Sequence, residues 1–142
     1  MVSEYRASPL LARVRTQRCQ PSDESSLDAG ARPANYCEVG GNPSVGKVQA
    51  FTHLLLEQLR PRSLAVVMNV VSNTRADLVA RGVIAACLEA GREPASTISV
   101  FRVPGAWEAE CEEILAHYGI AALDRSVGID DAARRAVGAL AA

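Results

Sequence analysis

The stretch from Glu38 to Val48, EVGGNPSVGKV, has glycines and a lysine at a spacing that can bind phosphate. From Gly41 it reads Gly, four residues, Gly-Lys, and then Val48 where the P-loop pattern has Ser or Thr. A P-loop NTPase needs that hydroxyl, and also an Asp at the end of a neighbouring apolar strand, to hold Mg²⁺. The next apolar run, SLAVVMNVV, contains Asn69 and no acid. Both magnesium contacts are missing, so the sequence disfavours an NTPase.

A second group of candidates follows the predicted strands. In an open parallel sheet, ligands bind beyond the carboxyl ends of the strands. The residues there are Gly40 and Gly41 after the first strand, Ser72, Asn73, Thr74 and Arg75 after the second, and Arg102 at the end of the third. Helix N-termini and guanidinium groups at such an edge suit a carboxylate or a phosphate. We therefore predict an anion site. Trp107, just beyond the third strand, is interpreted either as a packed residue or as a lid over the ligand.

Acid–base, nucleophilic and metal chemistry are less well supported. His53 and His117 both lie in predicted helices, where structural roles suit them, and they have no Ser, Cys or Asp partners at a catalytic spacing. The four cysteines lie far apart without a Cys-x-x-Cys pair, which predicts reduced thiols and no metal site. Thr74 and Asp77 have the spacing of a capping box at a helix start.

The elements that would position these residues alternate regularly from Ala34 onward. We predict strands at 34–39, 63–71, 96–103 and 120–123, and helices at 44–59, 74–90, 107–119 and 129–142. The order β-α-β-α-β-α-β-α predicts an α/β fold, an open parallel sheet with helices on both faces. Residues 1–33 are predicted to be an N-terminal arm or linker, disordered or with a short docking helix that includes Leu10, Leu11 and Val14. Residues 34–142 form the predicted domain.

Composition narrows the function classes. The chain has 142 residues, 49% of them hydrophobic, and a formal net charge of −1. This balance gives no electrostatic footprint for a nucleic acid or an anionic membrane surface. No apolar run reaches the ~18 residues of a membrane span, and we expect a cytoplasmic protein.

The order of the motifs resembles a known family. The segments RPANYCEVGGNPSVGKVQAF, AVVMNVVSNTRADLVARGVIAAC, ISVFRVPGAWEAECEEILAHYGI and IDDAARRAVGALAA resemble the C-terminal CoA-ligase domain of the succinyl-CoA synthetase β subunit. The resemblance runs from about Arg32 to the C-terminus without a large insertion. Its most specific part is the Pro-Ala-Asn-aromatic-x-x-x-Gly-Gly run from Pro33 to Gly41.

The resemblance implies a flavodoxin-like domain that follows an ATP-grasp region. The family forms acyl-CoA through an acyl phosphate and a phosphohistidine of the α subunit. By position, Asn35 would be a ligand of the substrate carboxylate. The substrate loop at a helix N-terminus would fall on Ser72, Asn73 and Thr74.

This sequence departs from the family pattern in three places. The loop VVSNTR lacks the family's glycine pair and is one residue shorter, and Pro104 replaces an acid after the third strand. Glycines allow backbone N–H groups to approach an anion closely, so their loss implies a changed or lost pocket. A 33-residue arm stands where the family has its ATP-grasp region.

Two functions from different classes remain open. The first is a free-standing subunit of a split ATP-dependent carboxylic acid ligase, inactive alone. It would take a small carboxylic acid, and it would receive ATP, Mg²⁺ and CoA through an ATP-grasp subunit and a CoA-binding α-like subunit. The second is a non-catalytic binding or scaffolding module that kept the fold and lost the site. A receiver or flavin module is a third possibility. The receiver is disfavoured because no acidic pair follows the first strand, and the flavin module would be excluded by an absence of yellow colour in the purified protein.

Overall fold

The computed structural model describes residues 2–6, 10–14, 33–37, 42–61, 63–68 and 73–141. The strands are β1 (Val2–Arg6), β2 (Leu10–Val14), β3 (Pro33–Cys37), β4 (Ser63–Val67) and β5 (Ile98–Arg102). The helices are α2 (Val45–Leu59), α3 (Ala76–Glu89), the single turn α4 (Pro94–Thr97), α5 (Glu108–His117) and α6 (Ile129–Ala141). No helix among these residues is long and apolar enough to cross a membrane.

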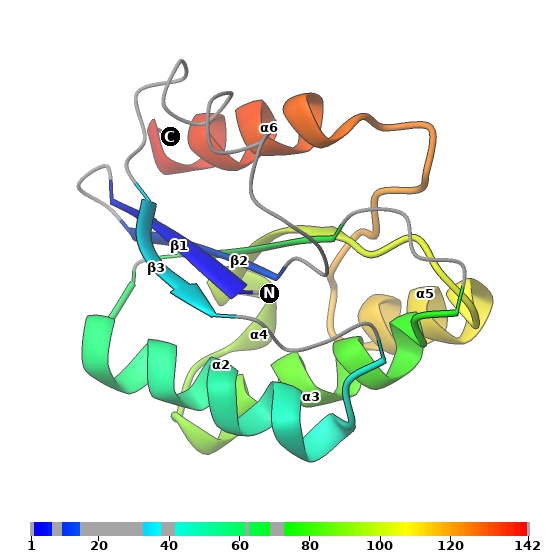
Figure 1. Ribbon diagram of the computed structural model, residues 1–142, viewed down its shortest axis with the longest axis horizontal. Coiled ribbons are helices and arrows are strands. Elements are labelled where there is room, and N and C mark those ends of the chain that lie inside the picture. The colour runs from blue at the N-terminus through cyan, green and yellow to red at the C-terminus, as the bar shows by residue number, and fades with distance from the viewer. Residues whose placement is uncertain are drawn as a thin grey trace.

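The sheet is mixed, with strand order β3-β1-β2-β4-β5 (Figure 1). β4 pairs in parallel with both β2 and β5, whereas β1 pairs antiparallel with both β2 and β3. Four strands therefore run in one direction and β1 alone is reversed. The prediction of a parallel sheet is confirmed for the neighbouring strands β4 and β5. It is wrong for the sheet as a whole, because β1 and β2 lie between β3 and β4 and β1 is antiparallel to its neighbours.

The N-terminal segment departs most from the sequence prediction. β2 occupies Leu10–Val14, where a docking helix was one of the predicted forms. Only three residues separate β1 from β2 in the sequence, too few for a crossover, so the two strands pair as antiparallel neighbours. This pair lies between β3 and β4.

The predicted fourth strand is also shorter than expected. Among residues 120–123, Ala122 forms an isolated parallel bridge with Phe101. The backbone N–H of Leu123 donates to the carbonyl oxygen of Phe101 at 2.8 Å. Residues 120–123 thus contact the edge of β5 without forming a full strand.

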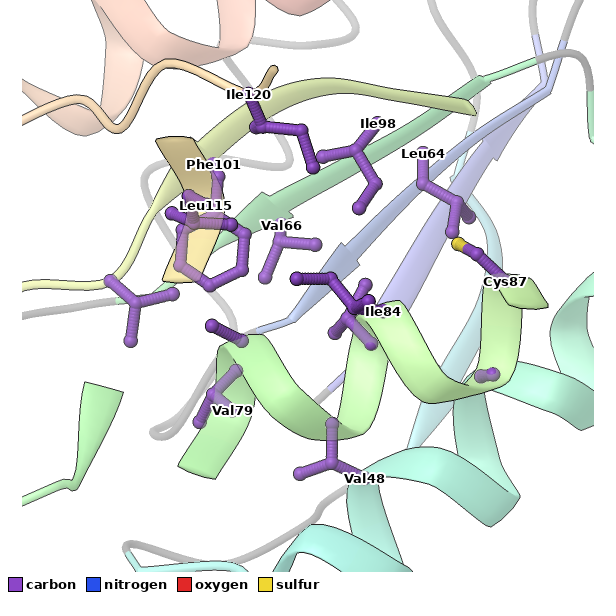
Figure 2. Close-up of a cluster of buried hydrophobic side chains, with 14 of the residues drawn as sticks. Val48, Leu64, Val66, Val79, Ile84, Cys87, Ile98, Phe101, Leu115 and Ile120 are labelled. Atoms are coloured by element: carbon purple, nitrogen blue, oxygen red, sulfur yellow. The ribbon is translucent and has the colours of Figure 1, made fainter. Parts of the chain in front are cut away.

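β4 is buried on both faces, and it separates two hydrophobic clusters. The larger cluster includes Leu64 and Val66 of β4 and lies against α2, α3 and α5 (Figure 2). The smaller cluster includes Ala65 and Val67 of β4 and packs against α6, on the opposite side of the sheet in Figure 1. Helices cover both faces of the sheet, as the continuous apolar pattern of this strand predicts.

The helix boundaries follow local signals in the sequence. Ser44 caps α2, and its side chain accepts a hydrogen bond from the backbone N–H of Lys47 at 3.3 Å. Lys47 is an exposed first-turn residue, which is the helical role that its position predicts. α3 ends just before Gly91, whose φ of +67° lies in the left-handed region.

Gly82 of α3 allows α2 to approach closely. A Cβ atom on Gly82 would lie 2.7 Å from Cβ of Val48 and 2.8 Å from the carbonyl oxygen of Val45. The second of these is a backbone atom, which cannot rotate away. The packing of α2 on α3 therefore requires glycine at this position.

We predict that Gly82→Ala lowers the free energy of unfolding by about 1–2 kcal/mol, because overpacking outweighs the gain in helix propensity. Gly138→Ala in α6 is the matched control, since its Cβ would meet nothing within 4 Å. The control is expected to raise the free energy of unfolding by up to about 1 kcal/mol. Urea denaturation of both variants measures the difference. An equal gain in both would contradict the close approach.

Candidate functional site

The chain segments that leave β4 and β5 are joined by backbone hydrogen bonds. The N–H of Ala106 donates to the carbonyl oxygen of Thr74 at 2.8 Å, and the N–H of Ala76 donates to that of Ala106 at 3.0 Å. Directly at the ends of the two strands, the N–H of Met68 donates to the carbonyl oxygen of Arg102 at 2.8 Å. These bonds place the starts of α3 and α5 at one edge of the sheet.

Arg75 and Asp77 form a bidentate ion pair at this edge. Arg75 Nε lies 3.0 Å from Asp77 Oδ1, and Nη2 lies 2.7 Å from Oδ2. The Asp77 side chain is only 4% exposed, whereas that of Arg75 is 35% exposed. The hydrogen bonds from Arg75 lower the pKa of the Asp77 carboxyl, and the same bonds raise the pKa of Arg75. Asp77 is thus a buried carboxylate whose charge Arg75 balances.

Trp107 covers one face of the same arginine. The guanidinium carbon of Arg75 lies 4.2 Å from the centroid of the Trp107 ring, which is a cation–π distance. Trp107 is the N-cap residue of α5 and has φ 63° and ψ 41°. Its side chain is half exposed. The ring therefore acts as a partial cover on Arg75, and it is not a core residue.

Arg102 is committed to the protein backbone. It is only 3% exposed. Its Nη1 donates to the carbonyl oxygen of Met68 at 2.8 Å, and its Nε donates to that of Val127. Burial lowers the pKa of Arg102, and the charge of Asp124 acts in the opposite direction. Arg102 joins the end of β4, the end of β5 and the segment that precedes α6.

Glu108, the first residue of α5, binds two groups outside the helix. Its Oε1 accepts hydrogen bonds from the backbone N–H of Gly105 at 2.8 Å and from Nη2 of Arg125 at 2.7 Å. Arg125 is thereby paired with a carboxylate of the protein itself. The side chain of Ser126 and then its backbone N–H, which donates to Oδ1 of Asp124, lower the pKa of the Asp124 carboxyl.

The structure brings several of the predicted site residues together. Asn73, Thr74 and Arg75 lie at the start of α3, and Arg102 lies at the end of the neighbouring strand β5. Gly40, Gly41 and Ser72 lie outside the described residues. Asn35 lies in β3, where it is in register with Glu4 of β1, and its role as a carboxylate ligand stays a prediction.

The sequence analysis did not identify the partners of the acidic residues Asp77 and Glu108. Asp77 was interpreted as a helix cap, but its carboxylate pairs with Arg75, and Arg75 itself occupies the N-cap position. The Arg-x-Asp spacing was the available signal. Glu108 was not identified as a functional residue in the sequence, yet its carboxylate binds Gly105 and Arg125.

The described thiols and histidines do not add an active centre. Burial raises the pKa of Cys87 to about 11 and that of Cys111 to about 12, so both are protonated at neutral pH. His53 lies between Glu57 and Glu89, with Nε2 3.3 Å from Glu57 Oε1. No cluster of three metal-ligating side chains occurs in the described part of the chain.

Comparison with known proteins confirms the resemblance seen in the sequence. No protein-family model matches the chain. It is 33% identical over 111 residues to the succinate–CoA ligase [ADP-forming] β subunit of Acidithiobacillus ferrooxidans, covering 78% of this chain and 27% of that protein. The same subunit of Pyrobaculum arsenaticum is 36% identical over 109 residues, covering 76% and 27% of the two chains. That of Rubrobacter xylanophilus is 35% identical over 118 residues, covering 80% and 30%. The matched region thus spans less than a third of these relatives.

The fold has a solved counterpart. ATP citrate lyase from Methanothrix soehngenii, solved in complex with citrate and coenzyme A, superposes with a TM-score of 0.57 at 11% identity. The superposition covers 84% of this chain and 36% of that one. At this identity the likeness concerns the fold alone.

We predict that Asp77→Asn lowers the free energy of unfolding by about 1–3 kcal/mol at neutral pH, because Arg75 loses its buried partner. A carboxyl whose pKa is lower in the folded state contributes stability above its unfolded pKa of about 3.9, and that contribution is lost as the pH falls through the folded-state pKa. The difference between the wild type and the variant should therefore shrink below about pH 4.

Asp131→Asn is the matched control. Asp131 pairs with Arg134 at the same 2.7 Å, but both side chains are more than half exposed. An exposed pair contributes about 0–1 kcal/mol. Urea denaturation across the pH range measures both variants. A loss at Asp77 that stays constant into acid would show that the ion pair is not its cause.

Proposed function

We propose, from its similarity to the β subunits of succinate–CoA ligases, that this chain supplies the acid-binding side of an ATP-dependent acid–CoA ligase. Two observations support the proposal. The chain is 33–36% identical to these subunits over at least 109 residues. In addition, Arg75 lies at the edge of the sheet where the chain leaves β4 and β5. The described part of the chain does not contain the ATP-grasp region of the family. We place ATP, Mg²⁺ and CoA on a separate ATP-grasp subunit and a CoA-binding α-like subunit, in the cytoplasm.

The described residues favour catalysis by positioning. Arg75 has a partly exposed guanidinium whose Nη1 has no hydrogen-bond partner among the described residues. Such a group binds a carboxylate or an acyl phosphate and stabilises the charge that develops on it. Among the described residues of this edge, the acids with shifted pKa values are Asp77 and Asp124, and both pKa values are lowered, which does not suit a general base. The contribution of this chain is to hold the acid where partner groups can react with it.

Arg102 contributes to this site indirectly. Because its Nε and Nη1 bind backbone carbonyl groups, it sets the spacing between the segments after β4 and β5. We propose a positioning role for Arg102, and we propose that direct contact with the anion falls on Arg75, with Asn73 and Thr74 beside it.

A non-catalytic binding or scaffolding module is the second candidate. Two observations favour it. Arg102 donates its hydrogen bonds to backbone carbonyl groups of the protein, and the negative charge of Asp77 lies beside Arg75 and opposes the binding of an anion there. Under this alternative, Arg75 and Asp77 only stabilise the start of α3. Calorimetric titration of the chain with CoA, succinate and related acids separates the two candidates, because a scaffold gives no heat with any of them.

The decisive test is the activity of the complex. We expect the chain, purified from its native host, to recover an ATP-grasp protein and a CoA-binding protein, and the complex to form acyl-CoA from an acid, ATP and CoA. Arg75→Ala should lower kcat/KM for the acid about a hundredfold, while KM for ATP and CoA stays unchanged. Arg134→Ala, an exposed arginine on α6, serves as the control. Recovery of neither partner would overturn the proposal.

A further inference from the structure

The turn that joins β5 to α5 is closed by the carboxylate of Glu108. Its Oε1 accepts a hydrogen bond from the backbone N–H of Gly105 at 2.8 Å and a second one from Nη2 of Arg125 at 2.7 Å. Hydrogen bonds to an ionised carboxylate are stronger than those between neutral groups. One oxygen atom of Glu108 therefore holds the turn closed and joins it to the segment that precedes α6.

Trp107, inside this turn, has a backbone conformation that needs support. Its φ of 63° and ψ of 41° lie in the left-handed region, which is unfavourable for a residue with a side chain. As the N-cap of α5, it also makes no side-chain capping hydrogen bond. Such conformations persist where the surrounding contacts over-determine them. The hydrogen bond from Gly105 to Glu108 spans Trp107 and is a contact of this kind.

The same turn is bonded to the start of α3. The N–H of Ala106 donates to the carbonyl oxygen of Thr74, and the carbonyl oxygen of Ala106 accepts from the N–H of Ala76. Arg75 lies between these two bonded residues, and the Trp107 ring lies 4.2 Å from its guanidinium carbon. The turn therefore holds the backbone at Arg75 and covers one face of its guanidinium.

We propose that Glu108 is a positioning residue for the anion contact of Arg75. The inference rests on the proposed function and deepens it. Glu108 acts through the turn and not by touching the acid, because a carboxylate repels an anion. Asp77 holds the Nε–Nη2 edge of Arg75 by bonds of its own. Loss of Glu108 should therefore weaken the binding of the acid without abolishing it.

The first test needs no ligand. Trp107 is the sole tryptophan, so its emission reports on its contact with Arg75. We expect Glu108→Ala, in which the turn loses its acceptor, to shift the emission maximum to the red as the ring moves from the guanidinium into water. Glu108→Gln retains an acceptor oxygen for Gly105 and should keep the wild-type emission. Glu113→Ala is the matched control, since Glu113 is an exposed acid of the same helix. All spectra are recorded where circular dichroism shows folded protein.

The second test measures the kinetics of the complex with the acid. We expect Glu108→Ala to raise KM for the acid about tenfold, because a displaced guanidinium loses part of its contact, while KM for ATP and CoA stays unchanged. Glu108→Gln should stay within about threefold of the wild type. Arg125→Gln should cause a smaller loss than Glu108→Ala, because the bond between Gly105 and Glu108 remains.

The outcomes separate this inference from the proposed function. Wild-type emission in Glu108→Ala overturns the inference, and so does a red shift with an unchanged KM for the acid. An equal rise of KM in Glu108→Ala and Glu108→Gln would assign the effect to the charge and not to the closed turn. A larger loss in Arg125→Gln than in Glu108→Ala would assign direct contact to Arg125, and either result overturns the inference. Failure to recover the partner subunits counts against the proposed function, and the emission of Glu108→Ala then still decides whether Glu108 positions the ring beside Arg75.

Discussion

The burial of β4 on both faces is the constraint on which the rest of the described domain depends. Leu64 and Val66 point into the cluster under α2, α3 and α5, whereas Ala65 and Val67 point into the cluster under α6. A strand of this kind must be flanked by other strands and covered by helices on both sides. The chain therefore leaves β4 and β5 at the same edge, and the helices that follow begin there.

Many polar groups of this edge are hydrogen-bonded to each other. Thr74, Ala76 and Ala106 exchange backbone hydrogen bonds, and Arg102 satisfies two carbonyl groups that burial would otherwise leave unpaired. Each charged side chain that helps to order the edge loses some capacity to bind a ligand. For Arg75 this loss is partial, since its side chain remains about one-third exposed. The same holds for Arg125, whose side chain is 62% exposed.

Local patterns in the sequence were sufficient to predict the helices α2, α3, α5 and α6 and the buried strands β4 and β5. Their apolar periodicity and end signals, such as Ser44 and Gly91, act within a few residues. β1 and β2 could not be predicted in the same way, because their place in the sheet depends on pairing with β3 and β4, which are distant in the sequence. At the site, the arginines were found from their position after strands. Whether each one faces a ligand or the backbone depends on tertiary contacts that spacing does not encode.

The absence of the family's glycine pair from the loop before α3 can be given a physical interpretation. A glycine pair brings backbone N–H groups close to an anion, which gives short contacts and little dependence on the side chains nearby. In this chain, Arg75 reaches the same edge with a side chain held by Asp77 and Trp107. An anion contact made by a guanidinium lies farther from the backbone, and its surroundings then include the indole. On the proposed function, an anion contact in this chain therefore depends on the two side chains that hold Arg75.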